Sequence, residues 1–174
     1  VYRKIDLANE AFLHWKMLCV KQRANDIKNI AYLLRKNTKN LSRIMAQEMG
    51  KPVREGEQEI EKCASTVDFF VDNAAQFLSP EKIRSEHESY VSFQPLGVIF
   101  GIMPWNFPWW QVIRFAIPTL LAGNTVVIKH AENVPSSAIS IQDIIDKAGL
   151  SNNLFNMLLI NKYHADKIIA HEHI

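Results

Sequence analysis

Apolar residues recur at the spacing of an α-helix through the first part of the chain, with lysine and glutamate on the opposite face. A polar run at residues 35–40 interrupts this stripe, and Asn40 is a plausible N-cap for the segment that follows. Gly50 is expected to end that segment as its C′ residue, and Ser79 and Pro80 to end the next one. The helices predicted in this way cover residues 5–20, about 27–34, 40–50 and 52–78.

Beyond residue 95 the helical stripe gives way to short apolar runs of strand length. The segments between these runs keep helical spacing and begin at Pro108 and Pro135, because proline suits the first turn of a helix. Upstream, residues 88–94 alternate polar and apolar positions and are expected to form a strand that pairs with another chain. The predicted strands cover residues 98–103, 125–128 and 155–160, and a short last helix covers residues 162–170.

This order of elements predicts an α/β fold in which an N-terminal helical layer precedes a β-α-β-α-β unit with a parallel sheet. A right-handed crossover puts the loop after the first strand at the carboxyl edge of the sheet, where open α/β sheets bind ligands. That loop reads PWNFP at residues 104–108, so two prolines stiffen a turn around Asn106. A carboxamide on a rigid turn can donate to an oxygen that is becoming negative. The alternative is an Asx-turn residue that bonds its own backbone.

Short motifs at these positions resemble the aldehyde dehydrogenase superfamily. They are PWNFP, an AGN and a lysine after the following helix, EMGKP at residues 48–52, PLGV at 95–98 and AGL at 148–150. The resemblance implies that residues 1–174 are an incomplete NAD-binding domain. Its expected parts are a helical layer at 1–80, a strand or hairpin segment at 86–95 and the β-α-β-α-β part at 96–174.

The resemblance also implies which residues serve the site. Asn106 corresponds to the oxyanion donor and Lys129 to a lysine that hydrogen-bonds the adenosine ribose, although His130 stands where the family usually has proline. Glu132 stands where members that prefer NAD carry glutamate. The backbone beside the nicotinamide ribose corresponds to Ile102, Met103, Pro104 and Trp105. Without the resemblance, Lys129 and Glu132 are equally consistent with a solvated strand end and an exposed turn.

Arg114 is the candidate for substrate recognition. It lies eight residues after Asn106, two helical turns into the segment that begins at Pro108, amid apolar neighbours. In the succinate-semialdehyde dehydrogenase branch of the family, an arginine at this spacing grips the distal carboxylate of the substrate. The alternatives are an arginine that snorkels to the helix surface and one that pairs with an acid outside this chain.

The catalytic cysteine, the general-base glutamate and the Gly-Ser loop of the family lie in later parts of the enzyme. A catalytic domain is therefore expected to be absent from this chain. Cys19 and Cys63 lie on helical stripes and are expected to be buried reduced thiols. The charged residues at the helix ends, Glu48, Lys51, Glu57 and Glu59, are interpreted as packing and capping features.

Composition excludes several classes of function. The net charge of +2 arises from interleaved acids and bases, so it does not indicate nucleic-acid binding. His164, His171 and His173 have no acid or cysteine at a suitable spacing, so no metal site is expected. No apolar run approaches the length of about 18 residues that a membrane span needs, and the chain is expected to be soluble and cytoplasmic.

Two functional hypotheses follow. The first is a fragment of an NAD-dependent aldehyde dehydrogenase that acts on succinate semialdehyde and is inactive alone. Its partners would be the small aldehyde, a separate chain with the missing domains, and further copies of itself. The second is a non-catalytic remnant from a truncated gene that binds nucleotide weakly or only binds a partner.

Overall fold

The computed structural model describes residues 1–85 and 87–174, so the first residue of the predicted 86–95 segment lies outside the described residues. The fold is α/β with a parallel sheet, as predicted. The elements in chain order are α1 (Tyr2–Trp15), α2 (Val20–Ile27), α3 (Asn29–Met49), α4 (Val53–Phe77), β1 (Glu81–Ile83), β2 (Ser89–Val91), β3 (Val98–Ile102), α5 (Pro108–Leu121), β4 (Thr125–Lys129), α6 (Pro135–Lys147), β5 (Phe155–Leu158), the 3-10 turn η1 (Lys162–His164) and α7 (Ala165–Ile169).

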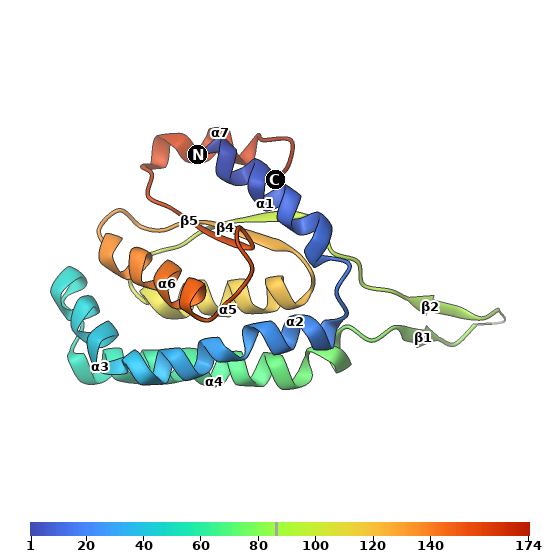
Figure 1. Ribbon diagram of the computed structural model, residues 1–174, viewed down its shortest axis with the longest axis horizontal. Helices are drawn as coiled ribbons and strands as arrows, with labels where there is room; N and C mark the ends of the chain where they lie inside the picture. The colour runs from blue at the N-terminus through green and yellow to red at the C-terminus, as the bar shows by residue number, and fades with distance from the viewer. Residues whose placement is uncertain (86) are drawn as a thin grey trace.

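The sheet lies between two layers of helices (Figure 1). α1 and α7 cover one face, and α5 and α6 cover the other, with the long pair α3 and α4 packed beyond them. The larger apolar core fills the space between the sheet, α5, α6 and the α2–α4 helices. A smaller cluster lies under α1 and α7 and includes Ile5, Ala8, Val127 and Ile168. The first helix therefore lies on the opposite face of the sheet from α2, α3 and α4.

Parallel pairing sets the register of the sheet, whose strand order is β3-β4-β5. Asn124, in the AGN motif, fixes the start of this register because its Oδ1 accepts the N–H groups of Leu96 at 2.7 Å and Gly97 at 3.1 Å. On the outer side of β5, Gln142 accepts the Met157 N–H at 2.7 Å and donates to the Phe155 carbonyl at 3.2 Å. Side chains thus satisfy backbone groups along this edge.

Two of the helix predictions were wrong. The helix expected at 5–20 ends at Trp15, and a separate helix begins at Val20. The apolar period continues across the break because both helices bury a stripe, but α1 buries it against the strands and α2 buries it against α4 and α5. The polar run at 35–40 does not interrupt α3, so Asn40 lies inside a helix instead of capping one. This run contains neither glycine nor proline, and its polar side chains face outward.

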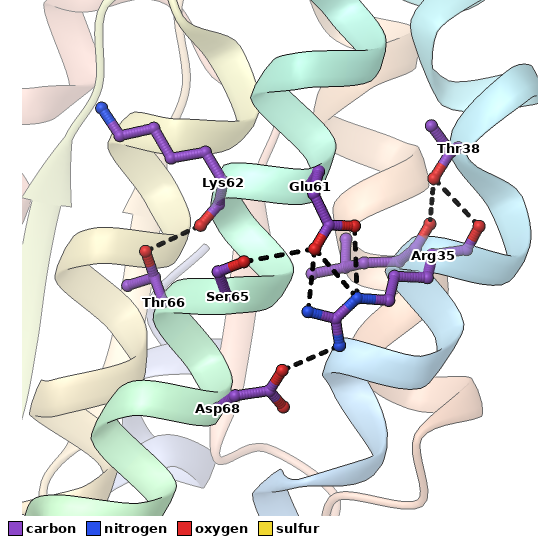
Figure 2. Close-up of polar contacts among 8 residues, drawn as sticks. Arg35, Thr38, Glu61, Lys62, Ser65, Thr66 and Asp68 are labelled. Atoms are coloured by element: carbon purple, nitrogen blue, oxygen red, sulfur yellow. Dashed lines mark hydrogen bonds and ion pairs between the residues drawn. The ribbon is translucent and has the colours of Figure 1, made fainter.

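Arg35, the first residue of that polar run, links α3 to α4 (Figure 2). Arg35 of α3 reaches Glu61 Oε1 at 2.9 Å and Asp68 Oδ2 at 2.8 Å, both on α4. Thr38 bonds back to its own helix through the carbonyl of Leu34. Hydrogen bonding to Arg35 lowers the pKa of Glu61 below its usual value. Arg35 therefore connects the two helices, whereas Thr38 bonds within α3.

The strand expected at 88–94 pairs with a segment of this same chain. β2 runs antiparallel to β1, with Lys82 opposite Tyr90, and the hairpin projects away from the body (Figure 1). No strand was predicted at β1, because Glu81, Lys82 and Ile83 show no apolar alternation; all three are exposed in the structure. None of the helices among the described residues is long and apolar enough to cross a membrane.

Candidate functional site

The predicted cofactor segment and Lys129 meet at the carboxyl edge of the sheet. Ile102 is the register partner of Lys129, and the next residue, Met103, donates its N–H to the Lys129 carbonyl at 2.9 Å. Pro104 and Trp105 follow directly and are exposed. Segments that are about 25 residues apart in the sequence therefore form one continuous edge, which is where parallel α/β sheets bind ligands.

Asn106 stands on the exposed turn between β3 and α5. Within the described residues its side chain makes no hydrogen bond, so the Asx-turn alternative finds no support in the structure. Pro108 occupies the first position of α5 and is buried, while Trp105 and Phe107 remain about half exposed. The carboxamide is thus free to donate to a ligand from a turn that is anchored at both ends.

A groove of about 850 Å³ runs beside β3. Ile102, Met103 and Pro104 form part of its wall, and Arg114 of α5 contributes to the same groove. The Nε of Arg114 donates to Gln111 Oε1 at 3.0 Å, and this bond does not involve its terminal amino groups. Arg114, the candidate for substrate recognition, therefore lies in the same groove as three of the residues predicted to contact the cofactor. Asn106 is not among the residues that line this groove.

Lys129 and Glu132 lie farther along the edge. Lys129 is 5% exposed, and its Nζ donates to the His130 carbonyl at 3.2 Å and lies 3.8 Å from Glu132 Oε1. Glu132 also accepts the Lys162 N–H at 2.9 Å and borders a hollow of about 200 Å³ with His130. A buried ammonium with one hydrogen bond has donors to spare, and ribose hydroxyls are suitable acceptors.

Two glutamates of the helical layer cap the helices that follow β3 and β4. The N-cap residues of α5 and α6 are apolar, Phe107 and Val134, and each precedes a proline. Glu59 Oε1 instead accepts the N–H groups of Trp109 at 2.9 Å and Trp110 at 3.0 Å. Glu48 does the same at α6, where it accepts from the N–H groups of Ser136 and Ser137.

These glutamates were expected to be packing and capping features, but the sequence did not predict that they cap α5 and α6. The available signal was an apolar N-cap followed by proline, which leaves the next two N–H groups without a local acceptor. A carboxylate at a helix N-terminus also interacts favourably with the helix dipole. Glu48 and Glu59 are therefore part of the structure that supports the site.

The cysteines lie in different surroundings. Cys63 is buried as predicted, and burial raises the pKa of its thiol well above the usual value. Cys19 is exposed at the N-cap of α2, so the prediction that it is buried was wrong; the helical stripe to which it was assigned is interrupted there. Among residues 1–85 and 87–174, no cluster of three or more His, Cys, Asp or Glu side chains is arranged to hold a metal ion.

Comparison with known proteins gives concordant results. The sequence profile of the aldehyde dehydrogenase family matches residues 1–174. A probable succinate-semialdehyde dehydrogenase [NADP(+)] of Synechocystis is 39% identical in an alignment of 175 positions, which covers all of this chain and 38% of the relative. The succinate-semialdehyde dehydrogenase [NADP(+)] of Deinococcus radiodurans is 35% identical over 96% of this chain and 35% of its own length.

The fold comparison agrees with the sequence comparison. The crystal structure of succinic semialdehyde dehydrogenase from Streptococcus pyogenes, in complex with NADP+, superimposes with a TM-score of 0.95 at 28% identity. The superposition covers 99% of this chain and 38% of that one. The chain thus spans somewhat over a third of the length of these relatives.

Proposed function

This chain belongs to the aldehyde dehydrogenase family, and from that membership we propose that it forms the cofactor-binding edge and oxyanion loop of an enzyme that oxidises an aldehyde with NAD. The observation that supports this best is the hydrogen bond from Met103 to the Lys129 carbonyl. It joins the segment that leads to Asn106 with the lysine that would hold a ribose. The product is the corresponding carboxylic acid.

Asn106 acts on the carbonyl oxygen of the aldehyde. As a nucleophile adds to the carbonyl carbon, negative charge develops on this oxygen, and the Asn106 Nδ2–H donates to it. Loss of one such donor typically costs about 3 kcal/mol of transition-state stabilisation. The exposed carboxamide is suited to this role because it stands on a turn at the carboxyl edge of the sheet and its N–H groups are accessible.

The nucleotide is held by the chain's own groups along the edge. Lys129 donates to ribose hydroxyls, the backbone of residues 102–105 lies along the nicotinamide ribose, and Glu132 accepts from the adenosine ribose. When bound at this edge, NAD would supply the acceptor for the hydride that leaves the former carbonyl carbon of the nucleophile adduct. The relatives named above carry NADP(+) in their names, whereas the Glu132 carboxylate, 56% exposed at the edge, favours NAD over a 2′-phosphate.

The chain alone is expected to oxidise no aldehyde. Cys63 is a buried thiol with a raised pKa, so it supplies no thiolate. Cys19 lies far from Asn106. It precedes α2, whose Arg23 bonds the Leu121 carbonyl at the C-terminal end of α5. Asn106 precedes the other end of α5, and 14 residues at about 1.5 Å each separate the two ends by about 20 Å.

Titration of the purified chain with NAD tests the proposal, with tryptophan fluorescence as the signal because Trp105 lies on the edge. Saturable binding is expected, weakened about tenfold by Lys129→Met, since that change removes the ribose donors. Lys147→Met, on the exposed end of α6, is the matched control and should bind as the wild type does. Absence of binding to the folded chain would favour the competing hypothesis of a non-catalytic, partner-binding remnant.

A further inference from the structure

The start of α5 depends on a side chain from another part of the molecule. Pro108 at the first position has no N–H, and the side chain of the preceding Phe107 cannot accept a hydrogen bond. Trp109 and Trp110 therefore present the first backbone donors of this helix, and both donate to Glu59 Oε1 of α4. Glu59 is 4% exposed, so these bonds form away from water.

Lys51 completes the arrangement from the turn between α3 and α4. Its Nζ forms an ion pair with the other carboxylate oxygen, Glu59 Oε2, and the lysine is 7% exposed. The same ammonium lies 3.9 Å from the centre of the Phe107 ring, a cation–π contact. The pair thus contacts the chain immediately after Asn106, through Phe107, and the first turn of α5, through Trp109 and Trp110.

The far end of α5 is also fixed. Arg23 donates to the Leu121 carbonyl at 2.9 Å, and Trp15 Nε1 donates to the Leu120 carbonyl at 2.8 Å. With its C-terminal end held by two side chains, the helix has little freedom to slide along its axis. The contact with Glu59 then determines where the loop at residues 104–108 ends.

We propose that Lys51 and Glu59 are positioning residues that hold the loop of residues 104–108 and thereby aim the Asn106 carboxamide. This inference rests on the proposed function of Asn106 as an oxyanion donor. Neither residue of the pair lines the groove beside β3 or the hollow beside Glu132, and the pair acts through the backbone on either side of the loop. Its removal changes the local order of the loop more than it changes the stability of the whole chain.

The test compares isotopically labelled full chains by NMR, following amide exchange at Trp109 and Trp110 and the side-chain signals of Asn106. The informative variant is the double change Lys51→Met with Glu59→Leu, because replacing a buried ion pair by apolar residues is often neutral for global stability. Exchange at both amides should become about tenfold faster, since they lose their acceptor, and the Asn106 signals should shift or broaden. Lys51→Met with Glu59→Gln restores an acceptor without a buried charge and should restore the protection.

Glu48→Leu is the matched control, because Glu48 caps α6 in the same way. It should accelerate exchange at Ser136 and Ser137 and leave Trp109 and Trp110 unchanged. The proposal is overturned if the double change Lys51→Met with Glu59→Leu leaves the Asn106 signals unaltered. It is also overturned if all amides lose protection together in that variant. A wild-type chain that fails to bind NAD while the exchange results hold would refute the proposed function and leave the positioning role intact.

Discussion

His130 Nε2 lies 3.0 Å from the carbonyl oxygen of Pro108, so the imidazole joins the end of β4 to the first residue of α5. A carbonyl only accepts, so Nε2 carries the proton. Nδ1 accepts the Ala131 N–H at 2.8 Å and is therefore unprotonated. Both ring nitrogens are engaged in a residue that is 3% exposed, which fixes the imidazole as one neutral tautomer. Lys129 and the loop of Asn106 are thus linked a second time.

The first prediction is that His130 makes the stability of the chain sensitive to acid. Burial lowers the pKa of His130, an effect that the bond to Pro108 and the nearby Glu48 and Glu59 carboxylates oppose and Lys129 reinforces. Below about pH 6.5 the unfolded chain binds a proton that the folded chain excludes. As the pH decreases below about 6.5, the free energy of unfolding should therefore decrease by up to about 1.4 kcal/mol per pH unit, until the lowered pKa is reached.

Urea unfolding between pH 8 and pH 5 measures this dependence. His130→Gln keeps a donor for the Pro108 carbonyl but cannot titrate, so it should flatten the curve over this range. His14→Asn removes an exposed imidazole from α1 and serves as the control. Parallel curves for the wild type and His130→Gln would refute the assignment.

Gly50 supports a second prediction, about the turn that directs Glu48 and Lys51 toward α6 and α5. Its φ of 74° is in the left-handed region, where a side chain is strained. Gly50→Ala should lower the free energy of unfolding by about 1 kcal/mol, and Gly50→Asn by less, because asparagine tolerates this conformation. Urea unfolding at pH 7 distinguishes the two. Equal losses would mean that backbone strain is not the cause.

The parallel sheet and its crossover helices could be predicted because their signals are local. Apolar runs marked β3, β4 and β5, and prolines marked the starts of α5 and α6. The helical part was harder to predict, since one apolar period ran through two helices, of which α1 packs on the strands and α2 packs on other helices. Hydrophobic spacing reports which side of a helix is buried, but not what covers it.

The supporting contacts of the site could not be predicted, because their partners are far apart in the sequence. Glu59 and Trp109 are 50 residues apart, and Glu48 and Ser137 are 89 apart. A glutamate near a helix end has the same local appearance whether it faces water or caps another helix. The roles of Asn106, Lys129, Glu132 and Arg114 came from family resemblance and remain predictions.

The third prediction concerns the choice of nucleotide. Glu132 is oriented by the Lys162 N–H and lies 3.8 Å from Lys129 Nζ. A 2′-phosphate beside this carboxylate meets a repulsion of up to about 4 kcal/mol per unit charge at 4 Å. Titrations should show at least about tenfold weaker binding of NADP than of NAD, and Glu132→Ser should remove most of that difference. Glu10→Ser, exposed on α1, is the control; equal affinities in the wild type would contradict the role of Glu132.

The last prediction concerns the substrate, and it requires an active assembly of this chain with a polypeptide that carries a catalytic cysteine. Arg114 is exposed to the groove beside β3, and Gln111 engages only its Nε, so its terminal amino groups can bind a carboxylate in a bidentate contact. Such a contact contributes about 1.5 to 3 kcal/mol. Arg114→Met should therefore lower kcat/KM for succinate semialdehyde by roughly 10- to 150-fold and leave butanal oxidation nearly unchanged. Arg43→Met, exposed on α3, is the matched control. An equal loss with both aldehydes, or efficient use of butanal by the wild type, would show that Arg114 does not select an acidic substrate.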